Sequence, residues 1–338
     1  MIFFDTTKTG AASHRSGLTR VSARLRDELG PRASAAAWDD AARRAGPGDW
    51  FLTTELFSEE ERPGFSAFLA TRRCRLAAVF HDAIPLRHPH ITWPQSVARH
   101  PGYMKLLAQF DRVWAVSAAS RDDLLGYWRW AGLEKFPPVD VLALGADHAG
   151  SPRVTSRPAP RAARLLCVGI VEPRKNQALL LEACEALWSE GLAFELHLVG
   201  RVNPHFGRPI VARLRALQRT RGPALHFHEA ADDATVAALH ATARATVFPT
   251  LAEGCGLPVL ESLWQGVPCV CSDLPALREN ADAGGCLRVP PNDRPAWCDA
   301  LRRVLTDDAL IARLAAEAVA RPLPRWHAAA DTLATALR

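Results

Sequence analysis

The chain has 338 residues, which is too long for one ordinary hydrophobic core and suits two domains of typical size. Its hydrophobic fraction of 48% and charged fraction of 23% are typical of a globular protein, and 41 Lys and Arg against 36 Asp and Glu give a net charge of +5. Because no basic face interleaved with aromatic residues appears, nucleic acid is not an expected partner. Attraction to an anionic ligand or to an anionic membrane surface stays open.

The start of the chain and the cysteines both indicate a cytoplasmic location. Asp5 interrupts the apolar start MIFF, so no signal peptide is predicted, and no run approaches the roughly 20 apolar residues that span a bilayer. The eight cysteines form no C-x-x-C pair and several lie within apolar runs, which is typical of buried, reduced thiols. A peripheral contact with the inner face of the membrane stays open.

Short apolar runs alternate with longer amphipathic runs, a pattern that predicts parallel α/β architecture. In the first half, strands are expected at the start of the chain and at 49–54, 75–80, 111–117 and 139–146, and helices at 16–29 and 118–128. Ser120, three residues before Asp123, is the expected cap of the second of these helices.

The second half repeats the pattern after a stretch rich in proline and arginine, 151–164. Strands are expected at 164–171, 194–200, 224–229, 245–249 and 268–273, with helices at 176–191, 209–220, 232–243 and 257–266 between them. We therefore predict a first domain at 1–150, a linker at 151–163, a second domain at 164–320 and a terminal helical segment at 321–338. Ligands of such sheets bind beyond the carboxyl ends of the strands, so residues that follow strands are the first candidates for a site.

Two basic residues follow the first strand of the second domain, in the sequence VGIVEPRKN (168–176). Arg174 and Lys175 lie in the turn before a helix, where cations and a helix N-terminus suit an anion such as a diphosphate. The alternative is a pair of solvated turn residues.

A glycine-rich loop with two glutamates, LAEGCGLPVLE (251–261), follows a later strand and runs into a helix. Gly254 and Gly256 allow the backbone to approach a ligand and to present N–H groups to it. Glu253 is expected in the loop and Glu261 about one turn into the helix. The alternative is a well-capped strand-loop-helix connection without a ligand.

These motifs together resemble the retaining glycosyltransferases of family four, which have the GT-B fold. The resemblance rests on PRKN and on FPTLAEGCGLPVLESLWQGVPCVCSDLPALREN, in which seven residues separate Glu253 from Glu261 and the last loop reaches Glu279. HDAIPL (81–86) is similar to an HD-x-IPL signature of a branch with many mannosyltransferases, and SGLTR (16–20) is at the position of its first glycine loop. The tail RWHAAADTLATAL resembles the helix with which the family crosses back onto its first domain.

The resemblance implies two Rossmann-like α/β/α domains that face each other across a cleft and a nucleotide-sugar donor held mostly by the second. Arg174 and Lys175 would neutralise the leaving diphosphate, Glu253 would bind the transferred sugar, Glu261 would bind the ribose, and His81 would face the donor sugar; a satisfied histidine at a strand end is the alternative for His81. The other donor-binding residues that the resemblance implies are Gly17, Thr19, Gly254, Cys255, Gly256, Leu257 and His228.

The implied reaction is transfer of a hexose, with mannose as a candidate, to a glycan or lipid-linked acceptor in polysaccharide biosynthesis, with retention and with diphosphate as leaving group. It implies no cofactor and no metal; the co-substrate would be a nucleotide sugar, with GDP-mannose favoured and a UDP-sugar also considered. Ile170 stands where many members have arginine, and Arg174 is the candidate replacement. The alternatives are a GT-B nucleotide-sugar epimerase and a non-catalytic partner that binds nucleotide sugars.

Overall fold

The chain forms two compact units in the computed structural model, which describes residues 1–10, 17–147, 152–156 and 162–338. The first unit consists of Met1–Gly145 and Pro324–Arg338, and the second of Ala146–Leu323. Of the predicted linker, residues 151 and 157–161 lie outside the described part. Arg153 donates to the carbonyl oxygens of Ala318, Val319 and Arg321 within the second unit, so the described part of this stretch packs against that unit.

The first unit has a parallel sheet in the order β2-β1-β3-β4-β5-β6 among the residues described. Its strands are β1 (Ile2–Asp5), β2 (Ala33–Ala36), β3 (Trp50–Thr53), β4 (Arg75–Phe80), β5 (Arg112–Ala115) and β6 (Val139–Val141). Its helices are α1 (Gly17–Leu29), α2 (Trp38–Arg44), α3 (Phe65–Thr71), α4 (Ile84–Arg87), α5 (Pro94–Leu107), α6 (Ala118–Trp130) and α14 (Trp326–Ala336).

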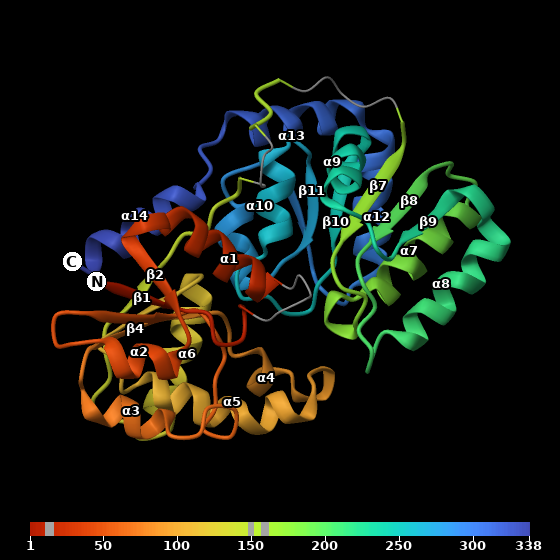
Figure 1. Cartoon of the computed structure of the whole chain (residues 1–338). Helices are drawn as coiled ribbons and strands as arrows, with labels where there is room; N and C mark the ends of the chain where they lie inside the picture. The colour runs from red at the N-terminus through yellow and green to blue at the C-terminus, as the bar shows by residue number, and fades with distance from the viewer. Residues whose placement is uncertain (11–16, 148–151, 157–161) are drawn as a thin grey trace. The chain divides into compact units, whose positions relative to one another are not determined.

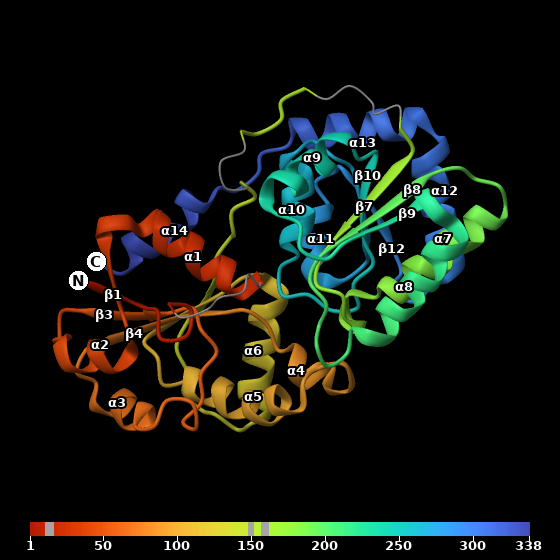
Figure 2. The same ribbon diagram turned by 45° about the vertical axis from the view of Figure 1, so that its right-hand side comes forward.

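Helices cover both faces of this sheet, as expected when every strand is parallel. Buried residues of α3, α5 and α6 pack with the strands in one apolar core that includes Phe51, Phe65 and Trp128. Helices α1 and α14 lie side by side in both Figure 1 and Figure 2. Arg32 just after α1 pairs with Asp331 of α14 at 2.5 Å, and the last segment of the chain is thereby part of the first unit.

The prediction that Ser120 is the N-cap of α6 is wrong, because the N-cap lies about one turn earlier. The helix begins at Ala118, and the side chain of Ser117 accepts a hydrogen bond from the Ser120 backbone N–H. The Ser120 hydroxyl instead donates to the carbonyl oxygen of His81 at 2.8 Å. Ser120 therefore ties the end of β4 to α6 and does not cap the helix.

The second unit has a parallel sheet in the order β12-β11-β10-β7-β8-β9 among the residues described. Its strands are β7 (Arg164–Val168), β8 (Glu195–Val199), β9 (Leu225–His228), β10 (Ala245–Phe248), β11 (Cys269–Ser272) and β12 (Cys286–Val289). Its helices are α7 (Gln177–Ser189), α8 (Arg208–Arg221), α9 (Asp233–Thr242), α10 (Leu257–Trp264), α11 (Pro275–Ala281), α12 (Arg294–Thr306) and α13 (Asp308–Ala320).

This unit is also a three-layer α/β/α arrangement. Helices α7, α8 and α12 share one apolar core with the strands, while α9, α10 and α11 pack on the opposite face. The two α/β sheets with flanking helices confirm the predicted fold class of Rossmann-like units.

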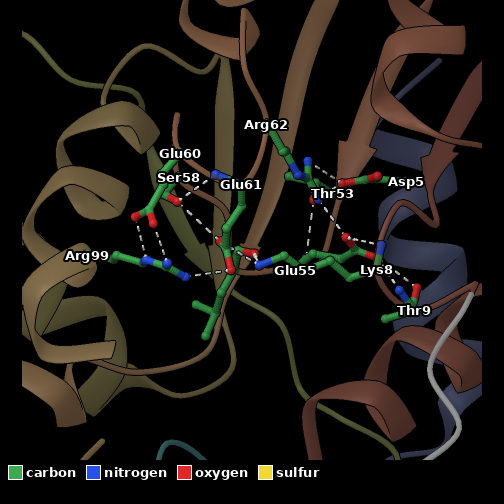
Figure 3. Close-up of polar contacts among 11 residues, drawn as sticks. Asp5, Lys8, Thr9, Thr53, Glu55, Ser58, Glu60, Glu61, Arg62 and Arg99 are labelled. Atoms are coloured by element: carbon green, nitrogen blue, oxygen red, sulfur yellow. Dashed lines mark hydrogen bonds and ion pairs between the residues drawn. The ribbon is translucent and has the colours of Figure 1, made fainter. Parts of the chain in front are cut away.

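A buried ion network joins the carboxyl ends of β1 and β3 in the first unit (Figure 3). Arg62 pairs with Asp5 at 2.8 Å and with Glu55 at 2.5 Å, and all three side chains are fully buried. Glu55 also accepts hydrogen bonds from the backbone N–H groups of Lys8 and Thr9. Burial and the nearby Asp5 raise the pKa of Glu55, and Arg62 supplies the compensating positive charge. The network therefore fixes the segment that follows β1.

Replacing Arg62 by Met leaves two buried carboxylates without their cation. We expect R62M to lower the free energy of unfolding by about 3–5 kcal/mol, the usual cost of breaking a buried pair from one side. Urea unfolding followed by circular dichroism measures this loss. The matched control is R43A, which removes an exposed i,i+4 pair with Asp39 and should change stability by less than about 0.5 kcal/mol. Equal effects of the two substitutions would contradict the prediction.

Candidate functional site

The order of strands in the second unit reverses between β7 and β10. The chain places β8 and β9 on one side of β7, and then β10, β11 and β12 on the other side. Ligands of doubly wound sheets bind beyond the carboxyl ends of the strands at such a point. The segments that leave these two ends are Gly169–Lys175 and Pro249–Glu253, which contain the predicted phosphate and sugar residues.

Three donors converge on one oxygen of Glu253 at this point. Lys175 Nζ lies 2.5 Å from Glu253 Oε1, Arg174 donates to the same oxygen at 3.1 Å, and the Thr250 hydroxyl donates at 2.8 Å. Of the four residues expected at the reacting sugar and diphosphate, the structure thus brings together Arg174, Lys175 and Glu253, while His81 lies in the first unit. The structure also shows a bond that the sequence did not predict, since the two cations were expected to face a phosphate.

The cluster is charged and nearly buried. The Glu253 side chain is 9% exposed and Lys175 11%, whereas Arg174 is 23% exposed. Burial would raise the pKa of Glu253, but Lys175 and Arg174 outweigh this effect and hold the pKa below its usual value. Burial lowers the pKa of Lys175, and Glu253 opposes that shift. Among the described residues, the hydrogen bonds to Glu253 all end on Oε1, which leaves Oε2 as an acceptor.

Backbone contacts fix the two loops against each other. The Leu251 N–H donates to the carbonyl oxygen of Arg174 at 2.8 Å, and the Thr250 hydroxyl oxygen lies 3.0 Å from the same carbonyl oxygen. Glu172 pairs with the Arg174 guanidinium at 2.9 Å and accepts from Asn203 at 2.9 Å, which orients that guanidinium. The sequence did not predict roles for Thr250, Glu172 and Asn203. For Thr250, the position just after a strand was the one feature that could have indicated a role in the site.

The glycine-rich loop leads into α10 as predicted. Gly256 is the residue before the helix and has a φ of 82°, in the left-handed region that favours glycine, and a Cβ there would also meet the end of the Leu277 side chain. The carbonyl oxygen of Cys255 accepts from Asn280 of α11 at 2.6 Å, and burial raises the pKa of the Cys255 thiol to about 12. Leu257 is the first residue of α10 and is buried together with Gly254. The loop is therefore held from α11 as well as from β10.

Glu261 lies on α10 and lines a small pocket at this end of the sheet. The other residues that line the pocket are Val168, His240, Thr246, Val247, Phe248 and Pro258. Lys175 Nζ lies 4.7 Å from the centre of the Phe248 ring, so Phe248 contacts both the pocket and the cation cluster. Glu261 and Glu253 thus lie at the same end of the strands of the second sheet.

His228 takes part in a different cluster. It lies at the carboxyl end of β9, and its Nε2 is 3.0 Å from Nδ1 of His197 on β8. Burial, together with the nearby His226, lowers the pKa of His228. The predicted donor contact of His228 stays a prediction.

His81 follows β4 in the first unit, as predicted. Its Nε2–H donates to the Thr54 carbonyl oxygen at 2.8 Å, which makes Nδ1 the acceptor nitrogen of a neutral ring. Burial lowers the pKa of His81, which favours this neutral form. Gly17 and Thr19 lie in the first turn of α1, while Ser16 of the same motif lies outside the described residues. Their predicted roles stay predictions.

Comparison with known proteins finds relatives of the second unit. Residues 162–307 match the family described as glycosyl transferases group 1. The serotype-specific mannosyltransferase WbdA of Escherichia coli is 30% identical over 244 residues, which are 68% of this chain and 28% of WbdA. The O-antigen chain mannosyltransferase B of Escherichia coli is 34% identical over 145 residues, 42% of this chain and 37% of that protein. The chain thus spans 28% and 37% of the length of these two relatives.

Solved structures show the fold over the whole chain. Anabaena HepE in complex with UDP superposes with a TM-score of 0.73 at 13% identity and covers 99% of this chain and 98% of its own. Sucrose-phosphate synthase of Thermosynechococcus elongatus gives a TM-score of 0.66 at 20% identity over 85% of this chain and 72% of its own. No helix in the described residues is long and apolar enough to cross a bilayer. The chain has the GT-B fold, and residues 162–307 match the family of glycosyl transferases group 1.

Glu253 is expected to stabilise the second unit through its two cations. E253Q should lower the free energy of unfolding by about 3 kcal/mol at pH 7, because Lys175 and Arg174 lose a nearly buried anion. Since the pKa of Glu253 lies below its usual 4.5, its contribution is present above pH 4.5 and is lost as the pH falls through the folded-state value.

Urea unfolding of the wild type and E253Q at several pH values between 7 and 3 measures the difference in the free energy of unfolding, which should narrow below pH 4.5. E182Q is the control, because Glu182 forms an exposed pair with Arg213 and should change stability by less than about 0.5 kcal/mol. A difference that stays constant down to pH 3 would contradict this assignment.

Proposed function

We propose that this protein is a retaining glycosyltransferase that moves a hexose from a nucleoside-diphosphate sugar to a glycan or lipid-linked acceptor. The observation that carries the proposal is the cluster of Arg174, Lys175 and Glu253 at the strand switch point of a glycosyltransferase group 1 domain. Such a place in the fold suits a nucleotide, and two cations suit the diphosphate that leaves when the sugar is transferred.

The cations would stabilise the negative charge that grows on the diphosphate as the glycosidic bond breaks. Lys175 is nearly buried, and a charge in such surroundings acts more strongly on a nearby phosphate than a solvated one. Arg174 is more exposed and has a planar guanidinium that can bind two phosphate oxygens. With both cations in place the proposed step needs no metal and no cofactor.

The two glutamates would bind the donor and not act as an acid/base pair. Oε2 of Glu253 can accept from a hydroxyl of the transferred sugar while Oε1 keeps its bonds to Lys175 and Thr250. Glu261 would accept from the ribose hydroxyls at its pocket, and the N–H groups of the loop 254–257 would add contacts to sugar and diphosphate. His81, Gly17, Thr19 and His228 complete the proposed set of donor contacts.

Retention is proposed to follow from front-face substitution through an oxocarbenium-like state. The acceptor hydroxyl attacks the anomeric carbon on the face from which the diphosphate departs, and its proton passes to a departing phosphate oxygen. Glu253 is already bonded to three donors, which disfavours a role as the nucleophile of a covalent intermediate. The main catalytic effect proposed is then the stabilisation of the negative charge on the departing phosphate.

GDP-mannose is the proposed donor and polysaccharide biosynthesis the proposed setting. The support is the similarity to WbdA and to the O-antigen chain mannosyltransferase B, both described as mannosyltransferases. HepE, a structural neighbour of low sequence identity, was solved with UDP, so a UDP-sugar is the donor to test beside it.

The exposed end of α6 is the proposed place of a peripheral membrane contact. Trp130 is 82% exposed, and the charged residues Arg129 and Lys135 beside it are exposed too. Trp favours the interface of a bilayer and cations favour anionic lipid headgroups. A lipid-linked acceptor would be reached from such a position.

A panel of nucleotides and nucleotide sugars tests the donor site. We expect GDP and GDP-mannose to raise the melting temperature more than UDP and UDP-glucose, and GDP-mannose to be hydrolysed slowly without acceptor. E261A should weaken GDP-mannose binding by about 10-fold or more, since it removes hydrogen bonds to a charged acceptor. K175A should lower kcat by about 100-fold with little change in donor affinity.

Exposed residues provide the controls for these variants. E182A and K105A carry the same kinds of change at exposed side chains outside the cluster, and these variants should bind and turn over the donor like the wild type. Stabilisation by no nucleotide at all would overturn the donor site. Binding with sugar epimerisation in place of transfer would identify an epimerase, and binding without any reaction a non-catalytic partner.

Flotation with vesicles tests the membrane contact. The wild type should float with vesicles that contain anionic lipid and not with neutral ones, and W130S should reduce the floated fraction by about threefold or more, because the exposed indole is lost. The control is H327Q, a change at an exposed position of α14. Equal flotation of W130S and the wild type would contradict a contact at this end of α6.

A further inference from the structure

Four polar side chains gather on one face of the two outermost strands at the β9 edge of the second sheet, apart from the Glu253 cluster. Glu195 and His197 lie on β8, and His226 and His228 on the edge strand β9. His197 and His226 are paired in the parallel register, as are Val199 and His228, so all four side chains lie on one face of these strands. That face also carries Val199, which packs with residues of the α9 side.

The geometry points to a zinc site formed by Glu195, His197 and His226. Among the described residues these three offer ligand atoms that all lie within 4.8 Å of one another. Two imidazoles and a carboxylate are a ligand set that binds Zn²⁺ and does not suit Mg²⁺ or Ca²⁺. A water molecule would complete a tetrahedral shell.

Glu195 and His197 are already spaced for a shared ion. Nε2 of His197 lies 3.1 Å from Oε2 of Glu195, and two ligands at about 2.0–2.1 Å from zinc with a tetrahedral angle are about 3.3 Å apart. His226 has to approach by at most about 1.5 Å from the 4.8 Å limit to reach that separation. Its ring is stacked on His197 at 4.3 Å, so a small side-chain rotation would direct its nitrogen to the ion.

His228 supplies the outer contact that zinc-bound histidines usually have. When Nε2 of His197 binds a metal, Nδ1 must carry the proton, and Nδ1 lies 3.0 Å from Nε2 of His228. Zinc would therefore fix the tautomer of His197 and orient His228 at the carboxyl end of β9. The site would also connect the edge strand β9 to β8 independently of the backbone ladder.

Arg164 competes with the ion for Glu195 and thereby limits the expected affinity for zinc. Its guanidinium contacts Oε2 of Glu195 at 2.7 Å, so zinc must share this carboxylate with a cation. The Glu195 side chain is 41% exposed and His197 is 8% exposed, which gives the ion a path from solvent to a mostly buried ring. We expect a dissociation constant on the order of 10 µM or tighter, weaker than that of closed zinc sites.

Zinc titration of the tag-free full chain, by competition with a chromophoric chelator, tests the site. The wild type should bind one Zn²⁺ with a rise in melting temperature of several degrees. H226Q and E195Q should weaken binding at least 10-fold, H228Q should weaken it less, and H327Q on α14 should leave it unchanged. Circular dichroism of each metal-free variant checks that the variant folds. If H226Q does not fold, the test rests on E195Q, which changes a half-exposed side chain.

Cobalt substitution identifies the ligands. Co²⁺ in the proposed site should give the visible bands of a tetrahedral nitrogen and oxygen shell without a thiolate charge-transfer band. A thiolate band would assign the ion to the cysteines and overturn the inference. Wild-type binding no tighter than that of H226Q would overturn it as well. Since these readouts do not involve sugar transfer, they stand or fall separately from the proposed function.

Discussion

The candidate site depends on one nearly buried carboxylate, Glu253, which holds two cations from a different loop. The loops leave β7 and β10, which are neighbours in space although about 80 residues apart in sequence. A parallel sheet brings the carboxyl ends of such strands to the same edge, and the reversal of strand order between them leaves room for side chains. The Leu251 N–H then holds the backbone of Arg174, and the Thr250 hydroxyl donates to the Glu253 carboxylate, which offsets part of the cost of burying that charge.

This arrangement has a consequence for the proposed chemistry. A buried ion pair contributes little net stability compared with apolar packing, but it fixes the direction of each charged group. With Glu253 and Glu172 in place, Lys175 and Arg174 are oriented before any ligand binds. A diphosphate would therefore meet preorganised cations, which is the condition under which electrostatic stabilisation acts most strongly on a transition state.

The sequence predicted the elements better than the contacts between them. Alternating apolar and amphipathic runs were sufficient for the α/β fold, and the rule on strand ends correctly grouped Arg174, Lys175 and Glu253. The salt bridges among them were not predicted, because residue type alone does not say whether a charge faces a ligand or a neighbour. The cap at Ser117 was missed because two serines one turn apart look equally suitable. The histidine cluster depends on the register of β8 with β9, which no local pattern determines.

A comparison of the two units supports the proposal that the second one holds the donor. In the first unit Asp5 and Glu55 lie at the ends of β1 and β3. Arg62 pairs with both, and all three side chains are fully buried. In the second unit the corresponding cluster keeps Arg174 at 23% exposure and one carboxylate oxygen of Glu253 outside the hydrogen bonds of the described residues. The carboxylates of the first network accept from protein donors such as the N–H groups of Lys8 and Thr9. A sealed network positions a loop, whereas an accessible cation beside an acceptor oxygen can bind a phosphate and a sugar.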